Sequence, residues 1–150
     1  MSNSYLIIGG SSDIAIQTIN KLLVDGNHVT ILARDMSRVS QLAEQGVTVI
    51  EGDALDEDIL KEANLEGSET VLALTNDDEN NMMACVLAEK SGLKKRTIAI
   101  VNKSNYNLLQ DSLNIDDLVD PRMTTVSRIM EHVHRGTIGT VYSVLDLSLI

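Results

Sequence analysis

The amino-acid sequence predicts an α/β fold, with a doubly wound parallel sheet of about six strands and a helix near the C-terminal end. Short aliphatic runs alternate with segments of helical periodicity, and the connections between them are short. The 150 residues are 43% hydrophobic, yet they include no Trp or Phe and only three Tyr. Such an aliphatic composition suits a parallel sheet that helices cover on both faces. The length corresponds to one domain of ordinary size.

Apolar spacing and turn residues define the elements expected in the N-terminal half. Ile14, Ile19 and Leu22 fall close to one helical face, and Asp25-Gly26-Asn27 ends that helix. The β-rich runs on either side are bounded by turn residues. In chain order, we expect a strand at 5–8, a helix at 14–24, a strand at 28–33, a helix at 36–44, a strand at 47–54 and a helix at 57–63.

The C-terminal half continues the alternation as far as about Gly136. Met82, Met83, Val86 and Leu87 recur at helical spacing after the apolar run TVLALT. In chain order, we expect a strand at 70–75, a helix at 80–91, a strand at 96–102, a helix at 106–112, a short strand at 118–119 and a helix at 124–135. The apolar segment that follows, 137–150, has no helix after it to cover it.

Charge and composition exclude several classes of function. The chain has 22 acidic and 12 basic residues and a net charge of −10, which argues against nucleic-acid binding and against adhesion to anionic lipid. The single cysteine, Cys85, excludes an internal disulfide and fits a reducing cytosol. No stretch approaches the roughly 20 apolar residues of a membrane span, and no signal peptide is visible. We therefore expect a cytoplasmic protein without direct membrane insertion, for which a partner subunit supplies any membrane span.

The first strand-to-helix turn is a candidate phosphate site, because backbone amides and a helix dipole converge there in open α/β sheets. Its length matches the G-x-x-x-G-x-G loop of short-chain dehydrogenases, with Asp13 and Ala15 in place of the second and third glycines. Two serines offer hydroxyl donors. Asp13 would place a carboxylate near a pyrophosphate, unless it simply caps the helix. The predicted cofactor-binding residues of this turn are Gly9, Gly10, Ser11, Ser12, Asp13 and Ile14.

The end of the second expected strand bears on the choice of nucleotide. An NAD site usually has an acid there, which accepts hydrogen bonds from the adenosine ribose. This chain has Ala33 followed by Arg34, and an arginine at this place can face a 2′-phosphate. A phosphorylated dinucleotide therefore fits at least as well as NAD. The alternative interpretation is that Arg34 is a solvated surface residue.

The carboxyl ends of two further strands are expected at the same edge of the sheet. Gly52 is followed by residues that would border an adenine ring, and the strand at 70–75 ends among polar residues. Helix capping and solvated charge also explain the acids in these two segments. The predicted cofactor-binding residues here are Asp53, Ala54, Leu74, Thr75 and Asn76.

The sequence predicts no catalytic or metal site. His132 and His134 are two residues apart, so on a helix they point in different directions and make a poor metal pair. The Tyr-x-x-x-Lys pair of short-chain dehydrogenases is absent, because no lysine stands four residues after Tyr106 or Tyr142. The similarity of the first turn to dehydrogenases therefore does not extend to their chemistry.

Three longer stretches resemble a single family. GDALDEDILKEANLEG, VLALTNDDENNMMACVLAEKSGLKKRTIAIVNKSNY and LNIDDLVDPRMTTVSRIMEHVHRG occur in the order and spacing of the TrkA-type nucleotide-binding domain, also called the RCK or KTN domain. The T-x-D-D-E pattern from Thr75 and the D-P-R pattern from Asp120 are the most specific parts. The resemblance runs from about Tyr5 to about Tyr142.

The resemblance implies a Rossmann-like domain over residues 1–136, with 137–150 as the start of a C-terminal lobe or a docking segment. Members of this family regulate potassium channels and transporters from the cytoplasmic face of the membrane. They bind NAD(H), ATP or ADP in the cleft of the sheet, and they pair as dimers that often build tetramers or octameric rings. The helix at 124–135 is then the crossover helix that packs against the partner subunit. Gly52-Asp53, Thr75, Asp77 and Asp78 match the family, whereas the first turn and Ala33 depart from it.

Three functions remain open on the sequence alone. The first is a non-enzymatic regulatory domain that binds NAD(P)(H) or ATP/ADP, forms a homodimer or higher homo-oligomer, and controls a membrane-embedded potassium transporter subunit. The second is an NADP-dependent oxidoreductase of short-chain type. The third is a degenerate interaction module whose cleft holds no ligand.

Overall fold

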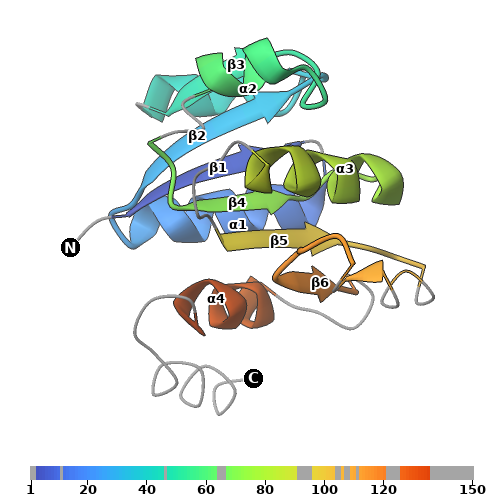
Figure 1. Ribbon diagram of the computed structural model, residues 1–150. Helices are drawn as coiled ribbons and strands as arrows, with labels where there is room; N and C mark the ends of the chain where they lie inside the picture. The colour runs from blue at the N-terminus through green and yellow to red at the C-terminus, as the bar shows by residue number, and fades with distance from the viewer. Residues whose placement is uncertain are drawn as a thin grey trace.

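The computed structural model contains a six-stranded parallel sheet in the order β3-β2-β1-β4-β5-β6 (Figure 1). The structure describes residues 3–10, 12–45, 47–63, 67–90, 96–103, 106, 109–110, 112–120 and 126–135. Every strand pair in this part of the chain is parallel. The order reverses between β1 and β4, as in a doubly wound Rossmann-like sheet. The predicted fold class is therefore confirmed.

Strands and helices alternate along the chain, as the hydrophobic pattern predicts. The strands are β1 (Ser4–Ile8), β2 (His28–Ala33), β3 (Thr48–Glu51), β4 (Thr70–Ala73), β5 (Arg96–Ile100) and β6 (Asp117–Val119). The helices are α1 (Asp13–Val24), α2 (Glu57–Glu62), α3 (Asp78–Glu89), α4 (Val126–Arg135) and the 3-10 helix η1 (Ser40–Gln45).

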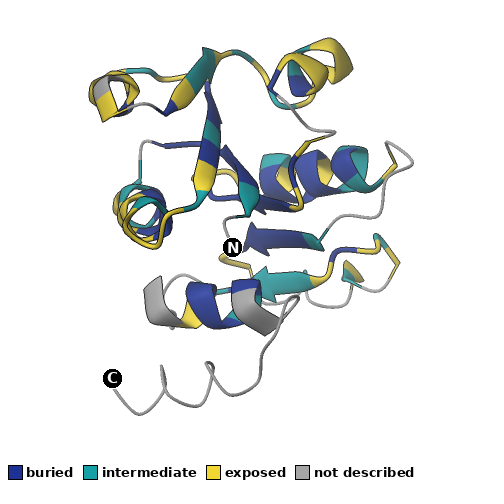
Figure 2. Ribbon diagram, turned by 90° about the vertical axis from the view of Figure 1, so that its left-hand side faces the viewer, coloured by how far each residue is buried: buried dark blue, intermediate teal, exposed yellow. Residues whose placement is uncertain are grey.

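Each face of the sheet has its own hydrophobic core, because successive strand residues point to opposite faces. Ile7 of β1 belongs to the core under α1, η1 and α4, whereas its neighbours Leu6 and Ile8 belong to the core under α2 and α3. All three are at most 3% exposed. In Figure 2 the strands between the helix layers are mostly buried, and the helices are exposed on their outer sides. The lack of large aromatic residues fits these two thin, aliphatic layers.

Side-chain caps determine where three helices begin. Ser12 accepts from the Ala15 amide at the start of α1, Asp56 accepts from Asp58 at the start of α2, and Asp77 accepts from Asn80 at the start of α3. Because Asp77 is the cap, α3 starts at Asp78, two residues before the expected helix at 80–91. In α1 the cap is Ser12, whereas Asp13 is the first helical residue.

The helix expected at 36–44 is wrong: turns lead into η1, a 3-10 helix. The Asp35 carboxylate accepts a hydrogen bond of 2.9 Å from the Ser37 amide, which holds a turn instead of a helix start. Val39 and Leu42 are both buried, and residues three apart align on one side of a 3-10 helix. The Leu42 amide donates to the Val39 carbonyl at 2.9 Å, as this tighter winding requires.

Other boundaries also differ from expectation. The strands predicted at 47–54, 70–75 and 96–102 end earlier, at residues 51, 73 and 100. Of the helix predicted at 106–112, the structure describes only part, where residues 106 and 109 are in 3-10 conformation. The first residues of the helix predicted at 124–135 and the whole segment 137–150 lie outside the described residues.

The position of α4 on the sheet edge is set by apolar contacts and by an ion-pair cluster. Ile129, Met130 and Val133 are at most 2% exposed and share a core with α1. Asp117 of β6 pairs with Arg96 of β5 and lies 3.2 Å from the Nδ1 atom of His132 on α4. The Arg96 side chain also donates to the His132 carbonyl at 3.0 Å. The described apolar side chains of α4 are thus used within the chain itself.

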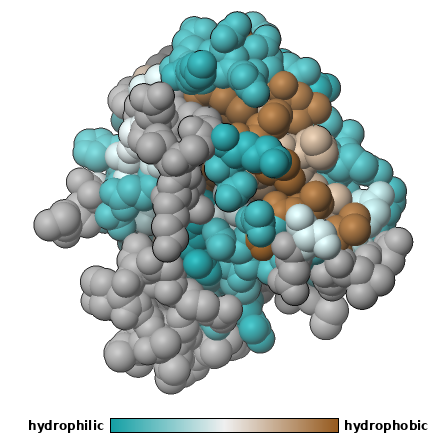
Figure 3. Space-filling model, in the orientation of Figure 1, coloured by the Kyte–Doolittle hydropathy of each residue, from teal (hydrophilic) through white to brown (hydrophobic). Residues whose placement is uncertain are grey.

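Apolar side chains gather on the surface over α2 and α3 (Figure 3). Leu55 and Met83 are 36% and 45% exposed there, and Ile59, Val86 and Leu87 are half-buried beside them. The helices on this side therefore leave part of the apolar surface uncovered. In the part of the chain that the structure describes, no helix is long and apolar enough to cross a membrane.

Cys85 is expected to resist thiol reagents until the protein unfolds. The residue is fully buried on α3, and burial raises the pKa of its thiol to about 12. At pH 8 the thiolate, which is the reactive form, is therefore scarce and inaccessible. Labelling with Ellman's reagent in native buffer and in urea checks this expectation. Rapid labelling of the native protein would contradict the packing of α3.

Candidate functional site

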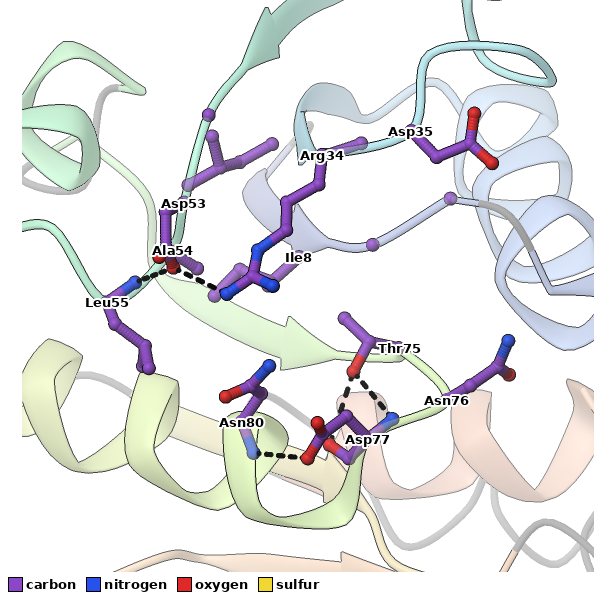
Figure 4. Close-up of a pocket in the computed structure, with 15 residues that line it drawn as sticks. Ile8, Arg34, Asp35, Asp53, Ala54, Leu55, Thr75, Asn76, Asp77 and Asn80 are labelled. Carbon is purple, nitrogen blue, oxygen red and sulfur yellow. Dashed lines mark hydrogen bonds and ion pairs between the residues drawn. The ribbon is translucent and has the colours of Figure 1, made fainter.

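A pocket of about 300 Å³ opens at the carboxyl edge of the sheet, where the strand order reverses. This is the place where open α/β sheets bind their ligands. Figure 4 shows its two sides: the ends of β2 and β3 face the loop between β4 and α3. The lining residues are Ile8, Gly9, Gly10, Leu32, Ala33, Arg34, Asp35, Gly52, Asp53, Ala54, Leu55, Thr75, Asn76, Asp77 and Asn80.

The structure brings together most of the residues that the sequence singled out. Predicted residues from all four strand ends line this one pocket: Gly9, Gly10, Ala33, Arg34, Asp53, Ala54, Thr75 and Asn76. Sequence reasoning did not select Ile8, Leu32, Asp35, Leu55, Asp77 and Asn80. Each lies within a few residues of a predicted strand end, and this proximity was a signal for all of them; Asp77 also belongs to the T-x-D-D-E pattern that resembles the family.

Four other predicted residues that the structure describes, Ser12, Asp13, Ile14 and Leu74, do not line the pocket. Ser12 is turned toward the protein, since its hydroxyl donates to the Leu74 carbonyl at 3.2 Å and accepts from Ala15. Leu74 is fully buried in the core, and Ile14 packs partly against the same core. Ser11 lies outside the described residues.

Asp13 does not obstruct the pocket. Its carboxylate lies 2.9 Å from the Nη1 atom of Arg38, and its side chain is 82% exposed. An acid in the first turn also interacts favourably with the helix dipole. The objection that this carboxylate occupies the place of a pyrophosphate therefore does not apply.

Three glycines along the pocket are required by packing within the protein. Gly9 has a φ of +97°, and a Cβ atom there would lie 2.8 Å from the Thr75 side chain. A Cβ on Gly10 would overlap the Val39 side chain, and one on Gly52 would lie 2.8 Å from the Ile59 side chain. Each of these glycines thus lets the chain approach a neighbouring element, whether or not a ligand is present.

Asn81 holds the loop between β4 and α3 in place. Its side chain is fully buried, accepts from the Thr75 amide at 3.0 Å, and donates to the Thr75 carbonyl at 3.0 Å and the Ile100 carbonyl at 2.8 Å. The Thr75 hydroxyl also donates to Asn81. Asp78, which is 5% exposed, accepts from the amides of Asn102 and Lys103. These bonds position Thr75 at the pocket.

Arg34 and Asp53 form an ion pair across the other side of the pocket. The Nη2 atom of Arg34 lies 3.2 Å from Oδ1 of Asp53, and both side chains are more than half exposed. The Leu55 amide donates to the same carboxylate at 2.9 Å. This bond and Arg34 keep the pKa of Asp53 below its usual value. Exposed pairs of this kind contribute little stability, so Arg34 is available to another anion.

The polar side chains of the described lining are few in kind. They are one arginine, one threonine, two asparagines and three aspartates, and the described lining residues include no His, Lys, Cys, Ser or Tyr. Tyr106 instead donates to Glu79 at 2.9 Å, outside the pocket. Within the described residues, no group of three or more His, Cys, Asp or Glu side chains is placed to hold a metal ion.

Comparison with known proteins identifies relatives of this domain. Residues 5–121 match the model of the TrkA-N domain family. The chain is 37% identical over 145 residues to the Trk system potassium uptake protein TrkA of Azorhizobium caulinodans, covering 94% of this chain and 31% of that protein. The chain therefore corresponds to less than a third of that relative's length.

Solved structures share the fold at lower sequence identity. The TrkA-N domain of the inner membrane protein ybaL from Escherichia coli has a TM-score of 0.73 at 17% identity, covering 93% of this chain and 98% of that one. The GsuK channel bound to NAD has a TM-score of 0.66 at 22% identity, covering 87% of this chain and 23% of that one.

Proposed function

Because this chain belongs to the TrkA-N domain family, we propose that it is a regulatory domain that binds an adenine nucleotide and controls potassium transport by a membrane-embedded partner. The observation that carries the proposal is the pocket at the sheet's switch point, which four strand ends line together. Its relatives include TrkA potassium uptake proteins. The proposed location is cytoplasmic, at the inner face of the membrane through that partner.

The geometry of the first turn supports phosphate binding. Amides in the first turn of a helix have no carbonyl partner within the helix. Asp13 and Ile14 start α1 but do not themselves line the pocket, so we propose that their amides receive a phosphate that extends from the pocket toward the start of α1. Gly9 and Gly10 line the pocket and have no side chains that would keep a phosphate away from the backbone, and the Asp13 carboxylate is paired with Arg38. Asp53 and Ala54 would then border the base.

Relatives of the same fold differ in the nucleotide they hold. GsuK has been solved with NAD and with ADP, and a Kef domain of Shewanella denitrificans with AMP. These ligands share an adenosine, so we propose NAD(P)(H) or ATP/ADP as the class for this chain. For binding, the pocket would contribute its shape, backbone amide donors and the Arg34 side chain. This proposal requires no covalent chemistry.

Regulation requires the nucleotide to favour one arrangement of the assembly over another. We propose a homodimer or higher homo-oligomer, with α4 as the contact that the family resemblance implies. The partly uncovered apolar surface over α2 and α3 adds support for association. The pocket lies between the ends of β2 and β3 on one side and the β4–α3 loop on the other. Exchange of one nucleotide for another could therefore shift these two sides relative to each other, and with them the helices that pack on the sheet.

Nucleotides are expected to raise the melting temperature of the chain without turnover. A ligand at 100 times its dissociation constant adds roughly 2.7 kcal/mol of stability, which corresponds to about 5–10 °C for a domain of this size. Thermal denaturation with NAD, NADH, NADP, NADPH, ATP, ADP, AMP and cyclic di-AMP measures the shift. Absorbance at 340 nm monitors oxidation of the reduced dinucleotides.

Two tryptophan variants make the measurement specific to the pocket. Asn76→Trp places a bulky side chain on an exposed lining position and should abolish the shift. Val24→Trp, on a residue that is 80% exposed at the end of α1, should leave it intact. Absence of any shift in the unaltered chain would instead favour the interaction module without ligand, and turnover of NADPH would favour the oxidoreductase.

A further inference from the structure

We propose that the pocket selects nucleotides that carry a phosphate on the 2′ position of the adenosine ribose, and that Arg34 is the residue that recognises it. This inference rests on the nucleotide binding proposed above and narrows it to one class of ligand. It starts from the end of β2, where an NAD site has its ribose-binding acid.

The last residue of β2 has no acid for the ribose hydroxyls. Ala33 lines the pocket, but its side chain is a methyl group, and its backbone carbonyl already accepts one hydrogen bond, from the Gly52 amide at 3.0 Å. The nearest carboxylate on this segment is that of Asp35, two residues further along, where it holds a turn by accepting from the Ser37 amide. The position that usually recognises the hydroxyls of NAD is therefore filled by a residue that cannot do so through its side chain.

Arg34 offers a donor to a phosphate at the same place. Its side chain extends over the pocket from the end of β2 toward Asp53 (Figure 4). Within the described lining it is the only cationic side chain. A guanidinium can donate two parallel hydrogen bonds to one phosphate. This bidentate interaction is stronger than the single exposed contact that Arg34 makes with Asp53.

Asp53 and Asp35 keep hydrogen-bond donors when Arg34 leaves Asp53 and binds a phosphate. When Arg34 turns to a phosphate, Asp53 still accepts from the Leu55 amide at 2.9 Å. Asp35 keeps its bond from the Ser37 amide, also at 2.9 Å. Without Arg34, however, the charged side chains of the described lining would be those of Asp35, Asp53 and Asp77, which would repel a second phosphate. Selection for the 2′-phosphate therefore depends on this one arginine.

Titration calorimetry with two matched ligand pairs tests the proposal. NADP against NAD, and adenosine 2′,5′-bisphosphate against AMP, differ only in the 2′-phosphate. We expect the phosphorylated member of each pair to bind at least about tenfold more tightly, as a bidentate arginine contact provides. Agreement of the two pairs shows that the adenosine 2′-phosphate, and not the nicotinamide half, is recognised.

Three variants assign the preference to Arg34. Arg34→Ala should reduce the ratio within each pair to about one or less, and Arg34→Lys should give an intermediate ratio because it keeps the charge without the fork. Arg38→Ala is the matched control: it removes an exposed, ion-paired arginine from the same loop that does not line the pocket. Any effect of Arg38→Ala on binding of the pyrophosphate should be equal for NAD and NADP. The ratio of their dissociation constants should therefore stay unchanged.

The outcomes separate this proposal from the function on which it rests. Equal binding within the pairs, or tighter binding of NAD, would overturn the 2′-phosphate preference while nucleotide binding stands. An equal loss of preference in Arg38→Ala would overturn the role of Arg34 and indicate a general effect of charge. No binding of any of the four ligands would overturn both proposals.

Discussion

Replacing Asn81 by leucine is expected to lower the free energy of unfolding by about 3–5 kcal/mol, because a buried group left without its hydrogen-bond partner costs about 1–3 kcal/mol. Leucine is similar in size but removes the partners of the Thr75 amide, the Thr75 carbonyl and the Ile100 carbonyl. The Asn81 side chain is fully buried and so is its bond to the Ile100 carbonyl, so water cannot replace that partner without opening the loop. Urea denaturation followed by circular dichroism measures the loss, and an unchanged slope shows that the folded state is otherwise similar.

The neighbouring Asn80 provides the control. It is half-buried, lines the pocket and contributes its backbone amide, not its side chain, to the Asp77 cap. Asn80→Leu should therefore change stability by no more than about 0.5 kcal/mol, as is usual for substitutions away from the core. If both variants lose the same free energy, the buried amide does not organise the loop. Because Asn81 holds Thr75 at the pocket, Asn81→Leu should also weaken nucleotide binding more than its loss of stability explains.

Replacing Gly9 by alanine is expected to lower the free energy of unfolding by about 2–4 kcal/mol, which combines the cost of a positive φ with that of steric overlap. Its φ is +97°, and the added Cβ would lie 2.8 Å from Cγ2 of Thr75 and 3.0 Å from the Thr75 backbone nitrogen. The backbone atom cannot move without displacing the end of β4. Thermal and urea denaturation of the variant measure the loss.

Gly26→Ala is a control that separates the cost of the positive φ from the cost of steric overlap in Gly9→Ala. Gly26 has a similar φ of +85°, yet a Cβ there would meet no atom within 4 Å. Gly26→Ala therefore carries only the backbone cost, about 1–2 kcal/mol. The difference between the two variants measures the contact between β1 and β4 at the pocket. Equal losses would show that β4 yields freely and that Gly9 is needed only for its backbone conformation.

Both variants act where β1 and β4 diverge and the pocket begins. Gly9 allows the β1 end to approach Thr75, and Asn81 holds Thr75 from the other side. The pocket is thus formed by a close approach of backbones that the protein maintains through hydrogen bonds and packing. A ligand entering it meets a preorganised wall on this side and the exposed Arg34–Asp53 pair on the other.

The candidate site was partly predictable because the ends of parallel strands meet at one edge of the sheet. The residues that follow four strands could be selected on this rule, and eight of them line the pocket. The rule failed for Leu74 and Ser12, since it does not say which side chain turns inward: Leu74 joins the core, and Ser12 bonds to the Leu74 carbonyl. It also missed Asp35 and Asp77, whose place depends on the turns they hold.

The sequence by itself determined the order of strands and helices along the chain, the core on both faces of the sheet, and the family. These features depend on strand alternation, helical spacing and capping residues, which are patterns among residues close to one another in the sequence. Only the tertiary structure decided that Asp13 turns to Arg38, that Arg34 crosses to Asp53 and that Asn81 supports Thr75. The reason is physical: these pairs join different elements, so their partners are set by how the helices and loops dock on the sheet. The same docking replaced the helix expected at 36–44 by turns and η1, where burial of Val39 and Leu42 outweighed helical propensity.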